Sequence, residues 1–209
     1  MEDVDSTTAI LSRTARLFRL NAQHAAIWIL VLAAVGFVLK GSVVVGGALG
    51  VIAQYSNTHR VLSELDLTLP GYQSPPVFPM LAISILTALA YFVGLTLLVL
   101  PGIILIVRWS ICIPVLIAED TGTIGALRGS WQATEGRFWP ILGALAVPIV
   151  PMIMIVGCLM LAKPMLGALT MKALASVVVN GLMVVVWYIA AAIYARPVGS
   201  LERLQEVSA

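Results

Sequence analysis

The chain has 209 residues, of which 60% are hydrophobic and only 11% are charged, and its mean hydropathy is +1.03. A soluble domain is about 45–50% apolar and about 25% charged, so this composition excludes an ordinary soluble protein. The net charge of +2 argues against a protein that binds nucleic acid. We therefore predict an all-α, polytopic membrane protein that forms a single integral membrane domain over residues 1–209.

The first segment, residues 1–19, is predicted to be an amphipathic cytoplasmic segment, with a helix that begins at Ile10. Its acidic start and the lack of a short apolar core argue against a cleaved signal peptide. A helix ending at Leu20 would carry a stripe of arginines and a separate apolar stripe; these are Arg13, Arg16 and Arg19, and Ile10, Leu11, Leu17 and Phe18. The pattern is typical of a helix that turns its arginines toward anionic lipid headgroups. A helix that docks a partner protein is the alternative.

The next apolar stretch, residues 25–53, contains one charged residue, Lys40. It can form one long kinked helix or two short spans, at residues 20–39 and 42–57, that turn at Lys40-Gly41. A span needs roughly 20 mostly apolar residues, so both helices of this first hairpin would be short.

Four further spans are predicted at residues 78–100, 103–118, 140–162 and 173–195, followed by a cytoplasmic tail at 196–209. Pro101 and Gly102 separate the first two of these spans. Because proline and glycine break helices and favour turns, we predict that these two residues form the tight turn of a helical hairpin.

The distribution of positive charge decides between five and six spans. Six spans with the N-terminus inside place every arginine except Arg108 on the cytoplasmic side, and place Lys40, Lys163 and Lys172 outside. Five spans would leave many arginines outside, against the positive-inside rule. The acidic residues also fall on the cytoplasmic side, and none lies in a span. We therefore predict six spans, with both termini cytoplasmic.

A second amphipathic cytoplasmic helix is predicted at residues 123–138. Its apolar stripe would consist of Ile124, Leu127, Trp131 and Phe138. Thr121 or Thr123 would cap its start and Gly136 would end it. Glu119 and Asp120 precede it, and we expect them to cap this helix or to pair with Arg128. Acid–base chemistry or binding of a divalent cation is the alternative for these two carboxylates.

Arg108 is the one charged residue inside a predicted span. It follows Gly102 by roughly 9 Å along a helix, a depth from which a long side chain can reach the outer headgroups. We expect Arg108 to do so, or to cap carbonyl groups freed near Pro101 or Pro114. A contact with lipid phosphate or another anion is the alternative.

The stretch from 97 to 143, LLVLPGIILIVRWSICIPVLIAEDTGTIGALRGSWQATEGRFWPILG, resembles the YciC-type bacterial inner-membrane proteins. It is also similar to the membrane domain fused to some glycerophosphodiester phosphodiesterases. The matching residues are Leu100, Pro101, Gly102, Ile103, Pro114, Glu119, Ala126, Leu127, Ser130 and Trp131. The N-terminal LSRTARLFRLNAQH and the final Tyr194 and Arg196 fit the same layout, whereas the loop after the first span is much shorter here. The resemblance implies a six-helix bundle in a bacterial inner membrane. It implies little about activity, because the phosphodiesterase chemistry belongs to a separate soluble domain.

No sequence motif for catalysis, a cofactor or a metal is present, and Cys112 and Cys158 lie in apolar runs as expected of packing residues. We therefore predict a non-enzymatic accessory, assembly or regulatory subunit that contacts membrane lipids and a membrane-protein partner or a second copy. The alternative is a small transporter, channel or lipid-handling protein in which Arg108 binds an anion or phosphate. An enzyme that uses Glu119, Asp120 and His59 is the weakest hypothesis.

Overall fold

A computed structural model describes residues 6–38, 43–68, 76–97, 99–161 and 167–208 of the chain. This described part contains helices and no strands, as the sequence predicts. The helices are α1 (Thr7–Leu20), α2 (Ala22–Val38), α3 (Val43–Glu64), α4 (Val77–Leu97), α5 (Val99–Arg108), α6 (Cys112–Glu119), α7 (Gly122–Ala133), α8 (Phe138–Leu161) and α10 (Ala168–Ser208).

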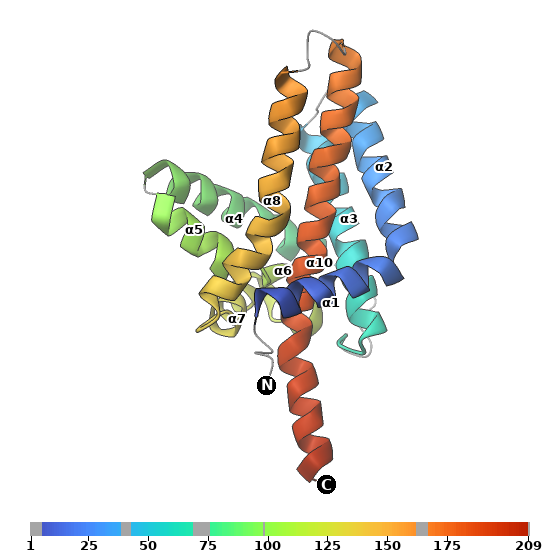
Figure 1. Cartoon of the computed structure of the whole chain (residues 1–209). Helices are drawn as coiled ribbons and strands as arrows, with labels where there is room; N and C mark the ends of the chain where they lie inside the picture. Colours follow the sequence, from blue (N-terminus) through green and yellow to red (C-terminus); the bar gives the residue numbers. More distant parts are fainter. Residues whose placement is uncertain (1–5, 39–42, 69–75, 98, 162–166, 209) are drawn as a thin grey trace.

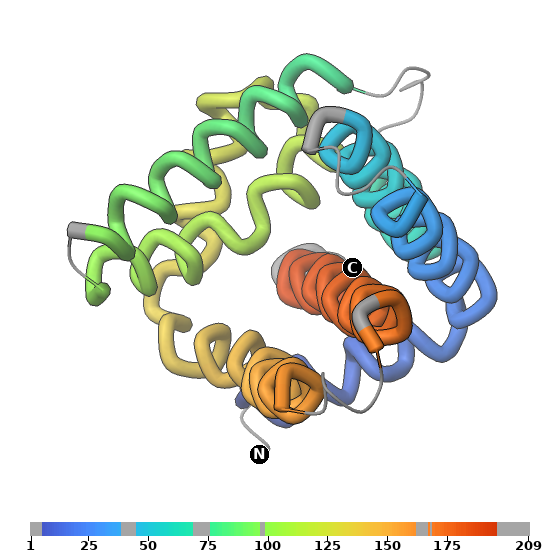
Figure 2. Tube along the Cα trace, turned by 90° about the horizontal axis from the view of Figure 1, so that it is seen from above, coloured from blue at the N-terminus to red at the C-terminus, as the bar shows by residue number. Residues whose placement is uncertain are grey.

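Helices α2, α3, α8 and α10 run side by side (Figure 1). Seen from above, α10 lies inside the ring that the remaining helices of the chain form (Figure 2). Helix α1 lies across one end of this bundle, and α4 and α5 leave it to one side as a hairpin, here called the arm. Four segments of the described chain are long and apolar enough to cross a membrane: Val77–Thr96, Val99–Glu119, Phe138–Leu161 and Leu169–Ala195. If the bent pair α1 and α2 is counted as one span, the described chain has up to five such segments. The fold is that of an α-helical membrane protein.

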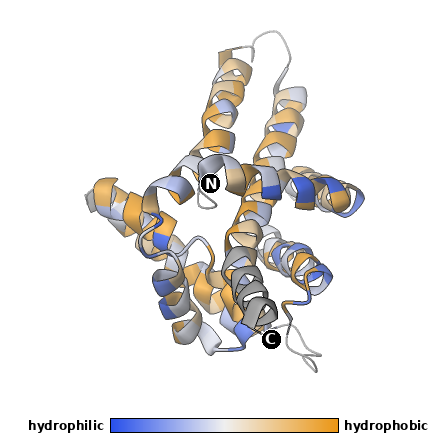
Figure 3. Cartoon of the chain, turned by 60° about the horizontal axis from the view of Figure 1, so that its bottom comes forward, coloured by the Kyte–Doolittle hydropathy of each residue, from blue (hydrophilic) through white to orange (hydrophobic). Residues whose placement is uncertain are grey.

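The two ends of the bundle differ in charge. Helices α1 and α7, the last turns of α3 and the start of α8 lie at one end, here called the basic end (Figure 1). Hydrophilic residues gather there, whereas the upright helices are mostly hydrophobic (Figure 3). The basic end holds Arg13, Arg16, Arg19, Arg60, Arg128 and Arg137. Lys172 lies in the first turns of α10, at the opposite end. Lys40 and Lys163 lie outside the described residues.

Helix α1 packs on the bundle with part of its predicted membrane-facing stripe. Ser6 caps the helix by accepting a hydrogen bond from the Ala9 N–H at 3.2 Å. Ile10 and Leu17 are buried, in contact with the cores that α10 and its neighbours build. The apolar stripe of α1 therefore packs against the bundle, and Leu11 and Phe18 contribute to the same contacts. At its end the chain turns by 83° into α2.

The first predicted hairpin has different boundaries from those expected. Its predicted turn at Lys40-Gly41 lies outside the described residues. Helix α3 continues to Glu64, well past the predicted end at residue 57. At the predicted end the buried side chain of Asn57 is satisfied within the fold: it donates to the Ala53 carbonyl at 2.8 Å and accepts from the Tyr188 hydroxyl at 3.3 Å. The apolar run that defines the predicted span ends at Asn57, but the hydrogen bonds of Asn57 keep this part of α3 within the bundle.

The predicted Pro101-Gly102 turn is wrong, because both residues lie inside the first turn of α5. Proline is tolerated there, since the N–H that it lacks would have no intrahelical acceptor. Gly102 instead allows the two helices of the arm to approach closely. A Cβ at Gly102 would lie 2.7 Å from the Leu95 backbone nitrogen, and one at Gly94 would lie 2.9 Å from the Gly102 Cα.

The predicted cytoplasmic helix at residues 123–138 is shorter than expected. Helix α7 ends at Ala133, and Phe138 begins α8 and so does not belong to its stripe. Gly136 has a φ of +74° and lies in the connecting turn, not at the last turn of α7. The predicted tail continues the last span without a break, since α10 runs to Ser208.

Candidate functional site

The predicted span at residues 103–118 is interrupted, and the interruption organises the surrounding residues. Helix α5 ends at Arg108 and α6 begins at Cys112, so the Arg108 carbonyl loses its place in a continuous helix. Helix α7 supplies the missing donor, the Ser130 hydroxyl at 2.7 Å. The Thr134 hydroxyl, just after α7, lies 3.4 Å from the same carbonyl and closer, at 2.8 Å, to the Ser130 carbonyl. Both residues are fully buried. Because an unpaired carbonyl away from water is costly, these contacts attach α7 to the break.

The Arg108 side chain follows its carbonyl toward α7. Its Nη1 donates to the Trp131 carbonyl at 3.3 Å, and its guanidinium lies 5.1 Å from the centre of the Trp131 ring. The expectation that Arg108 reaches the outer headgroups, away from the cytoplasmic helix, is therefore wrong. The break turns the end of α5 toward the basic end, and Arg108 joins the other arginines there.

The predicted pair Glu119 and Asp120 does not form a joint site. Glu119 Oε1 accepts a hydrogen bond from the Tyr194 hydroxyl at 3.2 Å and so ties α6 to α10. Asp120 ends α6 in the left-handed conformation with a φ of 47°. Within the described residues neither carboxylate pairs with Arg128 or caps α7, whose N-cap Thr121 makes no side-chain cap bond. That same part of the chain holds no group of three metal-ligating side chains.

Ile124 and Trp131 of the apolar stripe of α7 face outward, whereas Leu127 packs against the core. Ile124 is 75% exposed and Trp131 is 40% exposed, whereas Ala126 and Ser130 form the buried face. The outer stripe and Arg128 line a shallow hollow beside Trp109. Two faces of α7 thus have separate roles: one holds the α5–α6 break, and the other leaves apolar and basic side chains uncovered.

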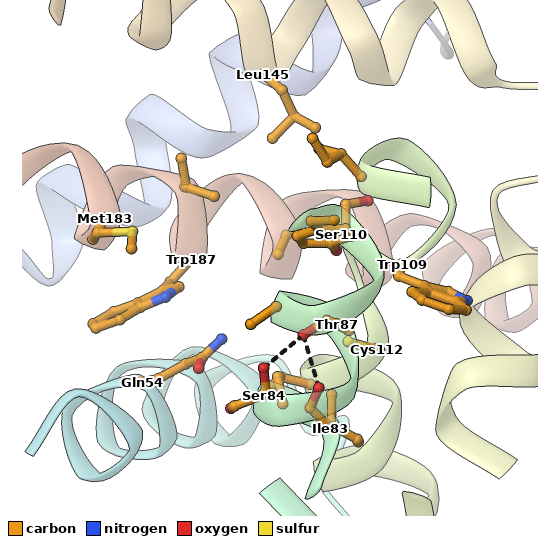
Figure 4. A pocket seen from close by; sticks show the side chains of 16 residues that line it. Gln54, Ile83, Ser84, Thr87, Trp109, Ser110, Cys112, Leu145, Met183 and Trp187 are labelled. Carbon is orange, nitrogen blue, oxygen red and sulfur yellow. Dashed lines mark hydrogen bonds between the residues drawn. The ribbon is translucent and has the colours of Figure 1, made fainter. Parts of the chain in front are cut away.

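A cavity of about 300 Å³ lies between the arm and the bundle. It is half open, and its walls come from α3, α4, α5, α6, α8 and α10 (Figure 4). This volume is at the lower end of the range of about 300–1,000 Å³ for small-molecule sites. The lining residues are mainly apolar: Gln54, Ile83, Ser84, Thr87, Ala88, Tyr91, Ile106, Trp109, Ser110, Cys112, Ile113, Leu145, Met183, Val186, Trp187 and Ala190.

The polar groups of this central cavity are of two kinds. The hydroxyls of Ser84, Thr87 and Ser110 donate to carbonyls of the preceding helical turn at 2.7–2.8 Å. Their oxygen atoms can still accept. The amide of Gln54 and the indole N–H of Trp187 make no hydrogen bond within the described part of the chain, and both reach toward the cavity (Figure 4). An elongated apolar molecule with one hydrogen-bond acceptor fits this chemistry.

Electrostatics at the basic end are dominated by half-buried arginines. Burial lowers the pKa of Arg13, and the nearby charge of Arg137 lowers that pKa further. Burial also lowers the pKa of Arg137, which donates to the Ala133 carbonyl. Thr7 fixes this region by donating to the Pro140 carbonyl at 3.3 Å. Positive charge therefore concentrates where α1 crosses the start of α8.

Several residues at these sites were not predicted from the sequence. Gln54 and Asn57 are uncharged polar residues in an otherwise apolar stretch, and this contrast is the signal that could have identified them. Trp187 and Tyr188 carry no such signal, because aromatic residues are common in membrane helices. The contacts of Arg108 with Ser130 and Trp131 connect separate helices and cannot be derived from spacing along one helix.

Compared with protein-family models, curated proteins and solved structures, the chain matches none.

Proposed function

We propose that the chain crosses a bacterial inner membrane six times, with both termini in the cytoplasm. The alternating directions of α2, α3, α8 and α10 support this sidedness of the termini, as does the separation of arginines from Lys172 (Figure 1). The segments Val77–Thr96 and Val99–Glu119 are long and apolar enough to supply the other two spans. The resemblance to YciC-type proteins suggests that this membrane is a bacterial inner membrane. A cysteine at position 172 should react with an impermeant reagent added outside, and one at position 60 should not. The reversed pattern would support five spans.

We further propose that the protein is not an enzyme but an accessory, assembly or regulatory subunit that works through contacts with lipids and another membrane protein. The observation that carries this proposal is the arm. Helix α4 is buried only near its base, by residues such as Met80 and Ile83. Beyond them the arm exposes large side chains, including Phe92 at 70% and Leu100 at 75%.

The arm differs from α8 not in exposure, since the α8 span is even less buried, but in projecting from the bundle as a separate hairpin. A projecting hairpin is suited to contact a neighbour. Its two helices are held together closely at Gly94 and Gly102, so it is a formed hairpin and not a loose segment. Membrane helices associate mainly by close packing. A preformed apolar hairpin that projects from a bundle offers that packing to a second protein at low entropic cost.

Photocrosslinking in native membranes tests this proposal. A photoreactive amino acid replaces Phe92 on the arm or, as the matched control, Ile153 on α8, which is 60% exposed. We expect a discrete protein adduct from position 92 and only lipid adducts from position 153.

Gly102→Ala supplies the second control, since its Cβ would displace Leu95 and distort the arm. The adduct from position 92 should then disappear. Identical adducts from positions 92 and 153, or no protein adduct from the arm at all, would contradict an accessory role through this surface.

The central cavity supports a second candidate, a lipid-handling protein. Arg108 does not line this cavity, so a ligand would be held by apolar contacts and by donors such as Gln54 and Trp187. An acyl chain that enters from the bilayer, with its ester oxygen near these donors, fits the lining.

A variant that keeps Trp187 as its only tryptophan can detect such a chain. In bilayers with brominated acyl chains we expect strong quenching of its fluorescence. Ala88→Leu, which fills the cavity from α4, should reduce the quenching. Equal quenching with and without this substitution would mean that Trp187 senses the bulk bilayer and not a bound chain.

A further inference from the structure

A second hollow, of about 410 Å³, lies at the corner where α1 turns into α2. Unlike the central cavity, it is lined mainly by polar side chains. Arg19 comes from α1, His24 from α2 and Arg60 from α3, so three helices bring basic groups to one place.

The start of α2 adds backbone donors to this hollow. The first N–H groups of a helix have no intrahelical acceptor, and within the described chain those of Ala22, Gln23 and His24 have no acceptor elsewhere. The His24 ring contributes as well. The Trp28 indole N–H donates to His24 Nε2 at 3.2 Å, and an indole can only donate. The Ser56 hydroxyl, 3.0 Å from the same nitrogen, is therefore a second donor to it. A neutral His24 therefore carries its proton on Nδ1, which is a further donor.

Glu64 contacts Arg60 and Asn21 of this hollow, and its two oxygens are already engaged. Oε1 accepts from Arg60 Nε at 3.3 Å and Oε2 accepts from Asn21 Nδ2 at 2.7 Å. The terminal nitrogens of Arg60 have no further partner in the described part of the chain. Asn21 is only 2% exposed, and its Oδ1 is buried without a hydrogen-bond donor. The corner thus holds spare donors for an anion and one acceptor that lacks a donor.

We propose that this corner binds the phosphate of a membrane phospholipid whose headgroup also carries an O–H or N–H donor. The phosphate lies between Arg19 and Arg60 and at the start of α2, where the helix dipole favours negative charge. The headgroup donor is directed toward Asn21. Leu20, which is 70% exposed, and Ile27, which is 58% exposed, flank the hollow where the acyl chains would continue. This inference deepens the proposed contact with lipids and depends on the proposed membrane placement.

The test is a lipid titration of the purified full-length protein, followed by native mass spectrometry. The probes are phosphatidylglycerol, phosphatidylethanolamine, phosphatidylcholine and inorganic phosphate. We expect saturable binding of the first two lipids and weaker binding of phosphatidylcholine, whose headgroup has no donor. Arg19→Gln and Arg60→Gln should each weaken binding roughly tenfold, as expected for loss of a charge-assisted hydrogen bond. Arg16→Gln is the matched control, because Arg16 lies on the same helix outside the hollow and should bind lipid like the wild type.

Equal losses in the Arg16 and Arg19 variants would overturn the proposal in favour of diffuse attraction. Binding of phosphatidylcholine as tight as that of phosphatidylglycerol would overturn the role of the headgroup donor. Inorganic phosphate that competes fully with lipid at matched concentration would identify a free anion as the ligand. Thermal unfolding of each purified variant, expected to match the wild type, reports its folding. Because the photocrosslink from position 92 tests the accessory role separately, either proposal can fail without the other.

Discussion

Helix α6 and the arm are both strongly apolar, but their surroundings differ. Every residue of α6 from Cys112 to Ala118 is buried, and Ile117 is only 1% exposed. On the arm Phe92 is 70% exposed, and most large side chains beyond the base are uncovered. In a membrane both environments are apolar, so hydropathy does not distinguish a helix inside the protein from one that faces lipid or a partner.

The difference between these regions comes from their connections. Helix α6 is short, and tertiary contacts hold both of its ends. The Arg108 carbonyl just before it is bound by Ser130, and Glu119 at its end is bound by Tyr194. The arm is held at its base and along its own hairpin. We infer that the α6 region provides stability and that the arm provides contact surface.

The largest effect is expected from truncating α6. Ile117→Ala should lower the free energy of unfolding by about 2–5 kcal/mol, because a buried residue leaves a cavity that its neighbours cannot fill. Phe92→Ala on the arm should lower it by less than about 1 kcal/mol, since lipid replaces the lost contacts. Unfolding measured by steric trapping in bicelles would check both variants. Equal losses would mean that the arm contributes to stability as much as α6 does.

The next prediction concerns the close crossing inside the arm. Gly102→Ala should cost about 1–3 kcal/mol, the usual range for overpacking, because its Cβ would lie 2.7 Å from the Leu95 backbone nitrogen. Gly157→Ala on α8 is the matched control, since a Cβ there meets no atom within 4 Å. Thermal unfolding in detergent would compare the two. If Gly102→Ala were as harmless as its control, the hairpin would be looser than described.

A third prediction tests the attachment of α7 to the α5–α6 break. Ser130→Ala removes the shortest hydrogen bond to the Arg108 carbonyl, and we expect a loss of about 1–3 kcal/mol, as for a buried acceptor left unsatisfied. Ser63→Ala, whose hydroxyl only donates to the Arg60 carbonyl at an exposed site, should change stability by less than about 0.5 kcal/mol. The same thermal assay would check both. An unchanged Ser130 variant would show that Thr134 alone satisfies this carbonyl.

Much of the fold could be predicted because apolar runs and breaks are local. The all-helical membrane class and the positions of α4, α8 and the last span follow from such runs. What could not be predicted depends on residues far apart in the chain. Arg108 was expected to face outward because its depth was counted along one helix, and that count could not include the break after α5. Pro101-Gly102 was assigned to a turn by residue type, whereas the close approach of Gly94 gives Gly102 its role.

The candidate sites show the same limit. Glu119 was correctly identified as a residue at the end of a span, but its partner, Tyr194, lies on another helix. The hollow at the α1–α2 corner joins Arg19 and Arg60, which are 41 positions apart in the sequence. The positive-inside rule predicts that both arginines lie on the same side of the membrane. It does not predict that they lie close together.

The smallest effect is expected at the polar contact between α3 and α10. Tyr188→Phe removes the hydroxyl that donates to Asn57 Oδ1 at 3.3 Å and should cost about 0.5–1.5 kcal/mol, the net value of a typical hydrogen bond. Tyr91→Phe is the matched control, because the Tyr91 hydroxyl has no partner among the described residues and should change stability by less than about 0.5 kcal/mol. Unfolding in bicelles would resolve the pair. A larger loss from Tyr91 would place a hydrogen-bond partner of its hydroxyl in the central cavity, and the lipid-handling hypothesis would gain support over a purely structural cavity.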